Sequence, residues 1–380
     1  MSDYSVHLLE VVRRLLRALD PVLLLVLLTL MGYALVIMGS ASPERLDSQL
    51  LHGAIALVTM WVVAAIPPQR LLGMALPLYL LGTVLLVGVD LFGEVSKGAR
   101  RWLDIGVTRI QPSELMKIAM PMMLAWFFQQ REGRIGLREF IVAGLMLVVP
   151  VGLILVQPDL GTSVLVAAAG FYVIFFAGLS WKLIVPVALV GIVGIGSIVA
   201  FGDTICQPDV DWKVMREYQK HRVCTLLDPT QDPLGKGFHI IQSTIAIGSG
   251  GITGKGWQNG TQTHLSFLPE RHTDFIFAVL SEEFGLVGTL VLLATYLLLL
   301  VRGFHIALVA PTLGTRLLAG AITMIFFTYA FVNMGMVSGI LPVVGVPLPF
   351  ISYGGTALVT LCLGVGILMS IQRSRISKQT

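Results

Sequence analysis

The sequence predicts an all-α polytopic membrane protein with ten transmembrane helices and one large extracytoplasmic loop. Of its 380 residues, 55% are hydrophobic and only 13% are charged, and the mean hydropathy is +0.84. Soluble domains carry about 25% charged residues. Apolar stretches near the roughly 20 residues that cross a bilayer recur along the whole chain. The predicted spans are 21–40, 50–67, 72–92, 112–129, 138–156, 161–178, 182–202, 273–301, 316–341 and 353–371.

The start of the chain and its basic residues predict the topology. Three arginines, Arg13, Arg14 and Arg17, run directly into the first span without a small-residue cleavage site behind it, which predicts an uncleaved signal-anchor. An even number of spans places both termini on one side of the membrane. Basic residues at both termini and in the short loop around residues 131–138 share that side, so we expect it to be cytoplasmic.

The loop 203–273, between the seventh and eighth spans, is the main feature outside the predicted bilayer. At about 70 residues it is too long for a simple connection. Within it, DWKVMREYQKHRVCTLLDP predicts a short amphipathic helix that ends at Asp228, and six glycines among residues 248–260 predict a close-approach or mobile loop. Cys206 and Cys224 also lie here, where an oxidising compartment permits a disulfide that the sequence leaves open. No linker or repeat divides the chain, so residues 1–380 are expected to form one integral membrane domain that includes this loop.

The segment LPVVGVPLPFISYGG interrupts the apolar region between the last two spans. Its prolines, Pro342, Pro347 and Pro349, prevent a regular helix from continuing through it. Non-helical backbone at membrane depth is tolerated only where protein or a water-filled cavity surrounds it. We therefore expect the segment either to line a cavity or to form a rigid outer turn.

Ionisable residues inside spans are costly and usually face a polar cavity. In RIQPSELMKIAM, Glu114 and Lys117 lie three residues apart on one helix face and can pair. They are either a structural ion pair or part of a polar site, and Arg101 and Arg109 just before this helix favour the site. In QPDLGTS, Asp159 is either the N-cap of the sixth span or a second residue of that site.

In FLPERHTDFIFAVLSEEFG, Asp274 lies at the outer boundary of the eighth span, beside Arg271 and His272. Partial burial next to basic residues is a setting in which a carboxylate is tuned to act as a general base. The alternative is that Thr273 or Asp274 caps the helix.

Other acids and motifs narrow the chemistry. Glu282 and Glu283 lie about 12 Å deeper at about 1.5 Å per residue, so we expect them to stabilise helix contacts or a partner interface. The stretch GITGKGW has a lysine but lacks the hydroxyl residue of a phosphate-binding P-loop. The seven histidines are scattered singly, so a protein-built zinc site is not expected. Carboxylates and basic residues are the available chemistry.

The longest motifs resemble one known family, the SEDS family (shape, elongation, division and sporulation), and its cell-elongation members more than its division members. The resemblance is carried by QPSELMKIA, QPDLGTS, IIQSTIAIGSGGITGKGW, FLPERHTDFIFAVLSEEFGLVG and SGILPVVGVPLPFISYGG. It implies the ten-helix SEDS fold in the bacterial cytoplasmic (inner) membrane, with both termini cytoplasmic. It also implies an inverting peptidoglycan glycosyltransferase that polymerises lipid II at the outer face during cell elongation and releases undecaprenyl diphosphate.

The resemblance assigns roles to the ionisable residues. Asp274 matches the catalytic general base of the family. The remaining candidates are expected to bind substrate. Glu114, Lys117 and Asp159 match residues that line the polar cavity of the family, and Arg101, Arg109 and Lys117 are expected to stabilise the leaving diphosphate. This predicted substrate-binding set consists of Arg101, Arg109, Glu114, Lys117, Asp159, Arg271 and His272.

The resemblance also implies partners. A class B penicillin-binding protein, which is a transpeptidase, is expected to contact the chain through membrane helices. Lipid II, lipid-linked glycan and other elongation-complex proteins complete the expected set, and no nucleic acid is expected. No metal ligand is assigned, although a divalent cation (Mg²⁺ or Mn²⁺) that bridges the diphosphate and Asp159 or Glu114 is left open.

Two other functions fit part of the pattern. A lipid II transporter or flippase would also need charged residues in its spans, but they should be distributed through the depth of the membrane. A non-catalytic scaffold for a penicillin-binding protein would not need the base. The grouping of Glu114, Lys117, Asp159 and Asp274 toward the outer side favours surface chemistry.

Overall fold

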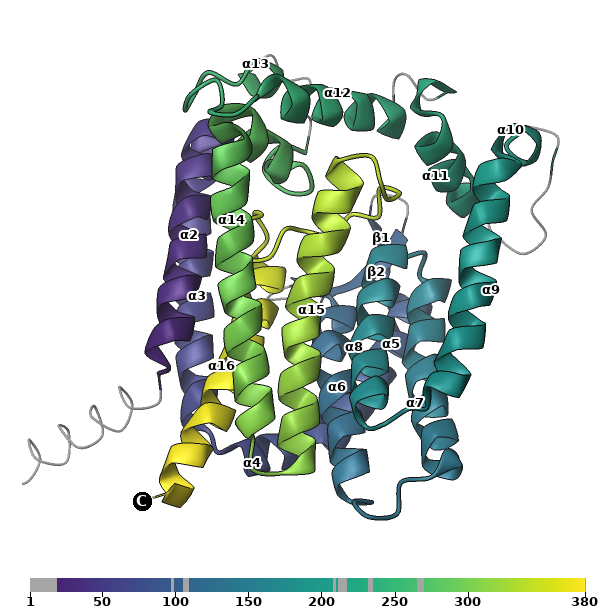
Figure 1. The fold of residues 1–380 in the computed structure, drawn as a ribbon, viewed down its shortest axis with the longest axis vertical. Coiled ribbons are helices and arrows are strands. Elements are labelled where there is room, and N and C mark those ends of the chain that lie inside the picture. Colours follow the sequence, from purple (N-terminus) through teal and green to yellow (C-terminus); the bar gives the residue numbers. More distant parts are fainter. Residues whose placement is uncertain are drawn as a thin grey trace, which may run out of the picture.

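The computed structural model describes residues 19–96, 99–104, 109–207, 210, 217–231, 235–264 and 270–379. Long helices run side by side, and shorter helices cross one end of the bundle (Figure 1). Within the described residues, a long helix lies at each of the ten predicted spans. These helices are α2 (Pro21–Ala41), α3 (Leu46–Ala65), α5 (Ala75–Phe92), α6 (Pro112–Gln129), α7 (Leu137–Val156), α8 (Leu160–Phe176), α9 (Trp181–Ala200), α14 (Ile276–Val309), α15 (Leu313–Val337) and α16 (Gly355–Gln379).

The prediction of a multi-pass helical membrane protein is confirmed. In the part of the chain that is described, eight segments have the length and apolar composition to cross a bilayer. The two other long helices are α8, which has only 17 residues, and α6, which contains Glu114 and Lys117. The count of ten crossing helices therefore stays a prediction, as does the single-domain organisation.

The extracytoplasmic loop carries structure of its own, as expected. It contains α10 (Gly202–Ile205), α11 (Glu217–Leu227), α12 (Lys236–Ser249) and α13 (Thr261–His264), and α12 lies across the end of the bundle (Figure 1). A helix is confirmed over α11, while residues 211–216 of the predicted amphipathic stretch lie outside the described part. The side chain of Lys220 on this helix is buried and donates to the carbonyls of Gln207 and Val210, so it does not face away into solvent as a polar face would. Cys206 and Cys224 form a disulfide, so the pairing that the sequence left open joins the end of α10 to α11.

A small antiparallel sheet follows α5 and was not predicted. Its strands are β1 (Glu94–Ser96), β2 (Ala99–Asp104) and β3 (Arg109–Ile110), in the order β1-β2-β3. β1 and β3 are too short to show an alternating pattern, and the six residues of β2, ARRWLD, do not alternate between apolar and polar. The sheet matters for the site because β2 and β3 lead directly into α6.

The eighth predicted span is not one continuous helix. Gly285 has φ 61° and ψ −157° and breaks α14. The glycine-rich loop supplies the hydrogen bonds that the break removes. Its carbonyls and amides pair with α14 as Leu286 N to Gly251 O (2.9 Å), Val287 N to Ile252 O (3.0 Å), Lys255 N to Glu282 O (3.0 Å) and Gly256 N to Glu283 O (3.0 Å). The close approach expected from the glycines is thereby confirmed.

Side-chain hydrogen bonds also connect this loop to α14. Glu282 is fully buried, and its Oε1 accepts from Lys255 Nζ at 2.7 Å and from the backbone N–H of Gln262 at 3.0 Å. Glu283 Oε1 accepts from Ser40 Oγ on α2. These two acids therefore stabilise contacts of α14 with the loop and with a neighbouring helix, one of the two roles expected for them.

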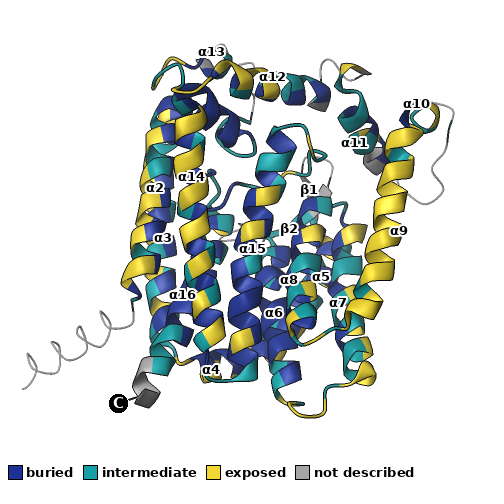
Figure 2. Cartoon of the chain, in the orientation of Figure 1, coloured by how far each residue is buried: buried dark blue, intermediate teal, exposed yellow. Residues whose placement is uncertain are grey.

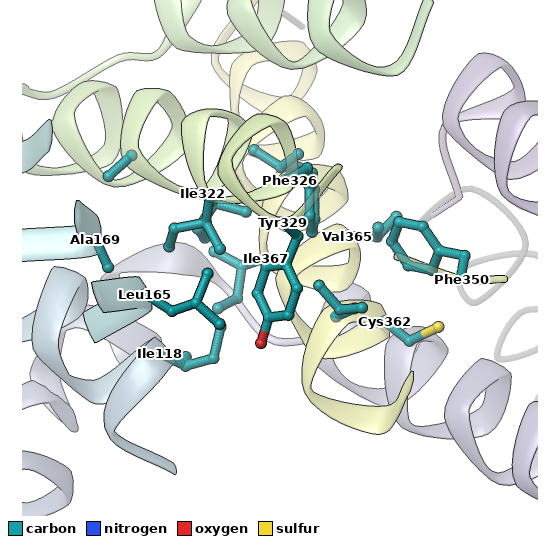
Figure 3. Close-up of a cluster of buried hydrophobic side chains, with 14 of the residues drawn as sticks. Ile118, Leu165, Ala169, Ile322, Phe326, Tyr329, Phe350, Cys362, Val365 and Ile367 are labelled. Carbon is teal, nitrogen blue, oxygen red and sulfur yellow. The ribbon is translucent and has the colours of Figure 1, made fainter. Parts of the chain in front are cut away.

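The centre of the bundle is formed by α6, α15 and α16. Figure 3 shows Tyr329 of α15 in this core, among apolar side chains that include Leu165 of α8 and Cys362 of α16. By contrast, no residue of α9 is buried, and this helix is exposed along its whole length at the margin of the bundle (Figure 2). A mean hydropathy of 2.6 over an α9 that faces outward fits a lipid environment.

Candidate active site

One cavity of about 850 Å³ lies at the N-terminal ends of four long helices, α6, α8, α14 and α16. Residues at or just before the first turn of each helix line it, namely Gln111, Asp159, Asp274 and Gly355. The aligned peptide dipoles give a helix N-terminus a partial positive charge and free N–H groups. The cavity is therefore suited to hold an anion.

The proline-interrupted segment forms part of the wall. Gly345, Val346, Pro347 and Tyr353 line the cavity. Of the two expectations for this segment, the cavity-lining one is confirmed.

Glu114 and Lys117 pair on the first turns of α6, as predicted. Lys117 Nζ lies 2.6 Å from Glu114 Oε1 and 5.2 Å from the centre of the Tyr329 ring. The Lys117 residue is only 3% exposed, and the second carboxylate oxygen of Glu114 is buried with no hydrogen-bond partner. Both residues line the cavity, so the ion pair belongs to the polar site.

Asp159 has both of the roles that the sequence suggested. Its Oδ1 caps α8 by accepting from the N–H of Thr162 at 3.2 Å. Its Oδ2 accepts from Gln111 Nε2 at 3.2 Å and lies 3.6 Å from Nε of Arg101. The Arg101 guanidinium also donates from Nη2 to the carbonyl of Pro158 at 3.1 Å. Arg101 and Asp159 thus join β2 to the start of α8 at the cavity wall.

Asp274 lines the cavity, but neither it nor Thr273 caps α14, so that alternative was wrong. The N-cap is Phe275. The reason is a turn before the helix, in which the N–H groups of Thr273 and Phe275 donate to the carbonyl of Glu270 at 3.1 and 3.2 Å. Thr273 Oγ1 donates to the Glu270 side chain instead of capping the helix. The Asp274 carboxylate lies close to the backbone of Gly345, where an added Cβ would be 3.5 Å from Oδ2.

Two members of the predicted substrate-binding set, Arg271 and His272, are not among the described residues that line this cavity, and a third, Arg109, is not tested. Arg271 donates from Nη1 to the carbonyl of Thr263 at 2.5 Å, which ties it to the extracytoplasmic loop. His272 packs its ring edge-on against Tyr353, with ring centres 5.9 Å apart. The side chain of Arg109, on β3, lies outside the described part of the structure.

The charge state of His272 follows from its surroundings. Burial and the nearby cation of Arg45 lower the pKa of this imidazole below its ordinary 6.5. This lowered pKa favours the neutral imidazole at pH 7, and the ring packs against Tyr353.

The structure also adds residues that the sequence did not single out. His52 of α3 lines the cavity, and its buried Nδ1 has no hydrogen-bond partner. Its ring lies 5.8 Å from that of Tyr353. The second added residue is Gln111, which precedes α6 and also lines the cavity. His52 was a single polar residue inside the predicted span 50–67, and Gln111 stood just before the span 112–129 among charged residues. Each is a weaker signal than a charge inside a span.

No group of three or more His, Cys, Asp or Glu side chains is placed to hold a metal ion within the described residues. The two carboxylates that were considered as ligands, Glu114 and Asp159, each lie beside a basic side chain. Whether a divalent cation binds here stays open, as the sequence left it.

Comparison with known proteins gives consistent matches. The family model of FtsW, RodA and SpoVE, described as cell cycle protein, matches residues 11–377. The chain is 52% identical to peptidoglycan glycosyltransferase MrdB of Escherichia coli (strain K12), covering 94% of each chain. It is 36% identical to stage V sporulation protein E of Bacillus subtilis (strain 168), covering 93% of this chain and 97% of the relative.

Solved structures match as well. A chain of a peptidoglycan synthase complex, described for its structural coordination of polymerisation and crosslinking, superposes with a TM-score of 0.76 at 35% identity, covering 94% of this chain and 98% of that one. Rod shape determining protein RodA of Thermus thermophilus superposes with a TM-score of 0.69 at 28% identity, covering 94% and 97%.

Proposed function

The chain belongs to the family of FtsW, RodA and SpoVE cell cycle proteins and is a peptidoglycan glycosyltransferase, and we propose that it polymerises lipid II with Asp274 as the general base. The reaction is placed at the outer face of the bacterial cytoplasmic membrane, with both termini cytoplasmic, and serves cell elongation. The observation that carries the proposal is the shared cavity. Asp274 lines the same space of about 850 Å³ as Arg101 and Lys117, at the N-terminal ends of four helices.

The reaction needs a base and an anion-stabilising wall. The base removes a proton from the 4-hydroxyl of the acceptor sugar as that oxygen attacks the anomeric carbon of the donor. The bond from this carbon to undecaprenyl diphosphate breaks at the same time, and a single displacement inverts the configuration. Asp274 supplies the base, and fixed positive charge near the departing oxygens stabilises the growing negative charge of the diphosphate.

The described cavity offers two kinds of positive charge for this diphosphate. Arg101 and Lys117 line it, and the four helix N-termini add oriented N–H dipoles. Each cation lies beside a carboxylate: Arg101 is 3.6 Å from Asp159, and Lys117 is 2.6 Å from Glu114. This pairing fixes the position of both cations before the substrate arrives, which is the condition for electrostatic preorganisation. A divalent cation bound with the diphosphate would find the same two carboxylates.

For the partner, we propose a class B penicillin-binding protein that contacts the long helices in the membrane, together with other elongation-complex proteins. The likeness to a chain of a peptidoglycan synthase complex supports this proposal.

The test uses the purified protein with its partner transpeptidase and lipid II. Asp274→Asn keeps the shape of the side chain and removes the base, so glycan strands should no longer form. Asp47→Asn is the matched control, because Asp47 is an exposed carboxylate in the first turn of α3 and should leave the rate unchanged. Glycan synthesis by Asp274→Asn at the rate of the unmodified protein would show that the assigned base is wrong. Movement of lipid II across vesicles without polymerisation would favour the transporter.

A further inference from the structure

Three successive backbone carbonyls, those of His272, Thr273 and Asp274, each accept a hydrogen bond from a distant part of the chain. The donors are, in the same order, the N–H of Tyr353 at 2.8 Å, Oγ of Ser352 at 2.6 Å and Nδ2 of Asn333 at 2.9 Å. All three carbonyls precede the N-cap of α14, so the helix itself does not use them. Partly enclosed carbonyls need partners, and here the partners come from the segment after α15 and from α15 itself.

Asn333 has a special place among these donors. It lies in the last two turns of α15 and is fully buried. Its amide nitrogen donates to two carbonyls, those of Asp274 at 2.9 Å and Val346 at 2.8 Å. One NH₂ group therefore uses both of its hydrogens to join α15, the residue before the α14 N-cap and the cavity wall.

Ser352 makes a parallel connection. Its Oγ donates to the carbonyl of Thr273 and accepts from the N–H of Leu348 at 2.8 Å. The same wall segment contributes Gly345, whose backbone lies beside the Asp274 carboxylate. The position of that carboxylate thus depends on a wall segment that Asn333 and Ser352 both hold in place.

We propose that Asn333 is a positioning residue for Asp274, with Ser352 as its second support. This inference rests on the proposed function. A general base has to lie within about 2.6–3.2 Å of the oxygen that it deprotonates. A misplacement of about 1 Å can lower the rate about 100-fold. Asn333 contacts the backbone of Asp274, is fully buried and is not among the described residues that line the cavity, so it acts through the base.

The direct test is Asn333→Asp, which keeps the shape of the side chain and replaces the donating nitrogen with an oxygen. That oxygen would face the carbonyls of Asp274 and Val346. With lipid II as substrate, we expect kcat to fall about 10- to 100-fold, with KM within about twofold because displacement of the base acts on the transition state. Ser243→Ala is the matched control. Ser243 is fully buried as well, and its Oγ donates at 2.8 Å to a carbonyl near the same end of α15, that of Val337.

Two further measurements keep the proposal decidable. Ser352→Ala removes one donor without adding bulk, and we expect its kcat to fall as well. This variant therefore tests the proposal even if Asn333→Asp does not fold. In both variants, deuterium uptake over residues 271–275 should be faster than in the unmodified protein. Folded Asn333→Asp and Ser352→Ala proteins with unchanged kcat, alongside an inactive Asp274→Asn, would overturn the positioning role alone. An active Asp274→Asn would overturn the proposed function itself.

Discussion

Replacement of Lys117 separates a purely structural ion pair from one that also serves the reaction. Its ammonium lies 2.6 Å from Glu114 Oε1, and the residue is 3% exposed. Lys117→Met keeps a long flexible side chain and removes the cation beside this enclosed carboxylate. Loss of one partner of a buried pair costs about 3–5 kcal/mol. We expect the lower end, about 3 kcal/mol, because the Glu114 side chain keeps 13% exposure toward the polar cavity.

A double-mutant cycle with Glu114→Gln isolates the interaction. Because Lys117→Met with Glu114→Gln leaves no charge to bury at this position, we expect the double variant to lose only about 1 kcal/mol, with a coupling energy above about 2 kcal/mol. The measurement is the free energy of unfolding in detergent, from a denaturant titration. Lys117→Arg keeps the charge and is the matched control. Additive losses within about 0.5 kcal/mol would refute the reasoning.

Polymerisation by the same variants then decides the role of the pair. If it only stabilised the fold, the double variant would recover activity together with stability. We expect it instead to stay at least about 100-fold slower than the unmodified protein, because the Lys117 cation is then missing from the transition state.

Two further predictions concern the extracytoplasmic loop. Gly254→Ala should destabilise it by about 3 kcal/mol, because an added Cβ would lie 2.1 Å from the carbonyl oxygen of Glu283 at a φ of +80°. Gly251 has φ +57° and open space around it, so Gly251→Ala should lower the free energy of unfolding by only about 1 kcal/mol. Thermal unfolding of both variants measures the two losses, and equal losses would contradict this account. Cys206→Ser opens the disulfide to Cys224, which spans 18 residues, and should destabilise the loop locally by about 3 kcal/mol. Limited proteolysis should then cleave residues 203–227 faster, whereas unchanged cleavage would count against a stabilising role.

The sequence was sufficient where chemistry stands out from an apolar background. The long helices begin and end within a few residues of most predicted spans, because apolar length reports bilayer crossing. Glu114, Lys117, Asp159 and Asp274 could be recognised because charge inside a span is costly, and all four line one cavity.

Other features depended on contacts that no local pattern encodes. Asn333 is an ordinary amide in an apolar span, and its two acceptors lie 59 and 13 residues away. The break at Gly285 leaves the hydropathy of the span unchanged, so the predicted helix was continuous. The expectation that Thr273 or Asp274 caps α14 failed because hydrogen bonds to Glu270 fold the preceding residues into a turn.

The break in α14 gives a membrane-spanning helix an uncommon hydrogen-exchange behaviour. The N–H groups of Leu286 and Val287 belong to the span, yet their acceptors are carbonyls of the extracytoplasmic loop. In an unbroken helix, such an amide exchanges with deuterium only when the helix itself opens. Here, detachment of the loop is enough for these two amides to exchange. Deuterium uptake at these two amides therefore reports how often the outer loop leaves the bundle, without any label on the loop.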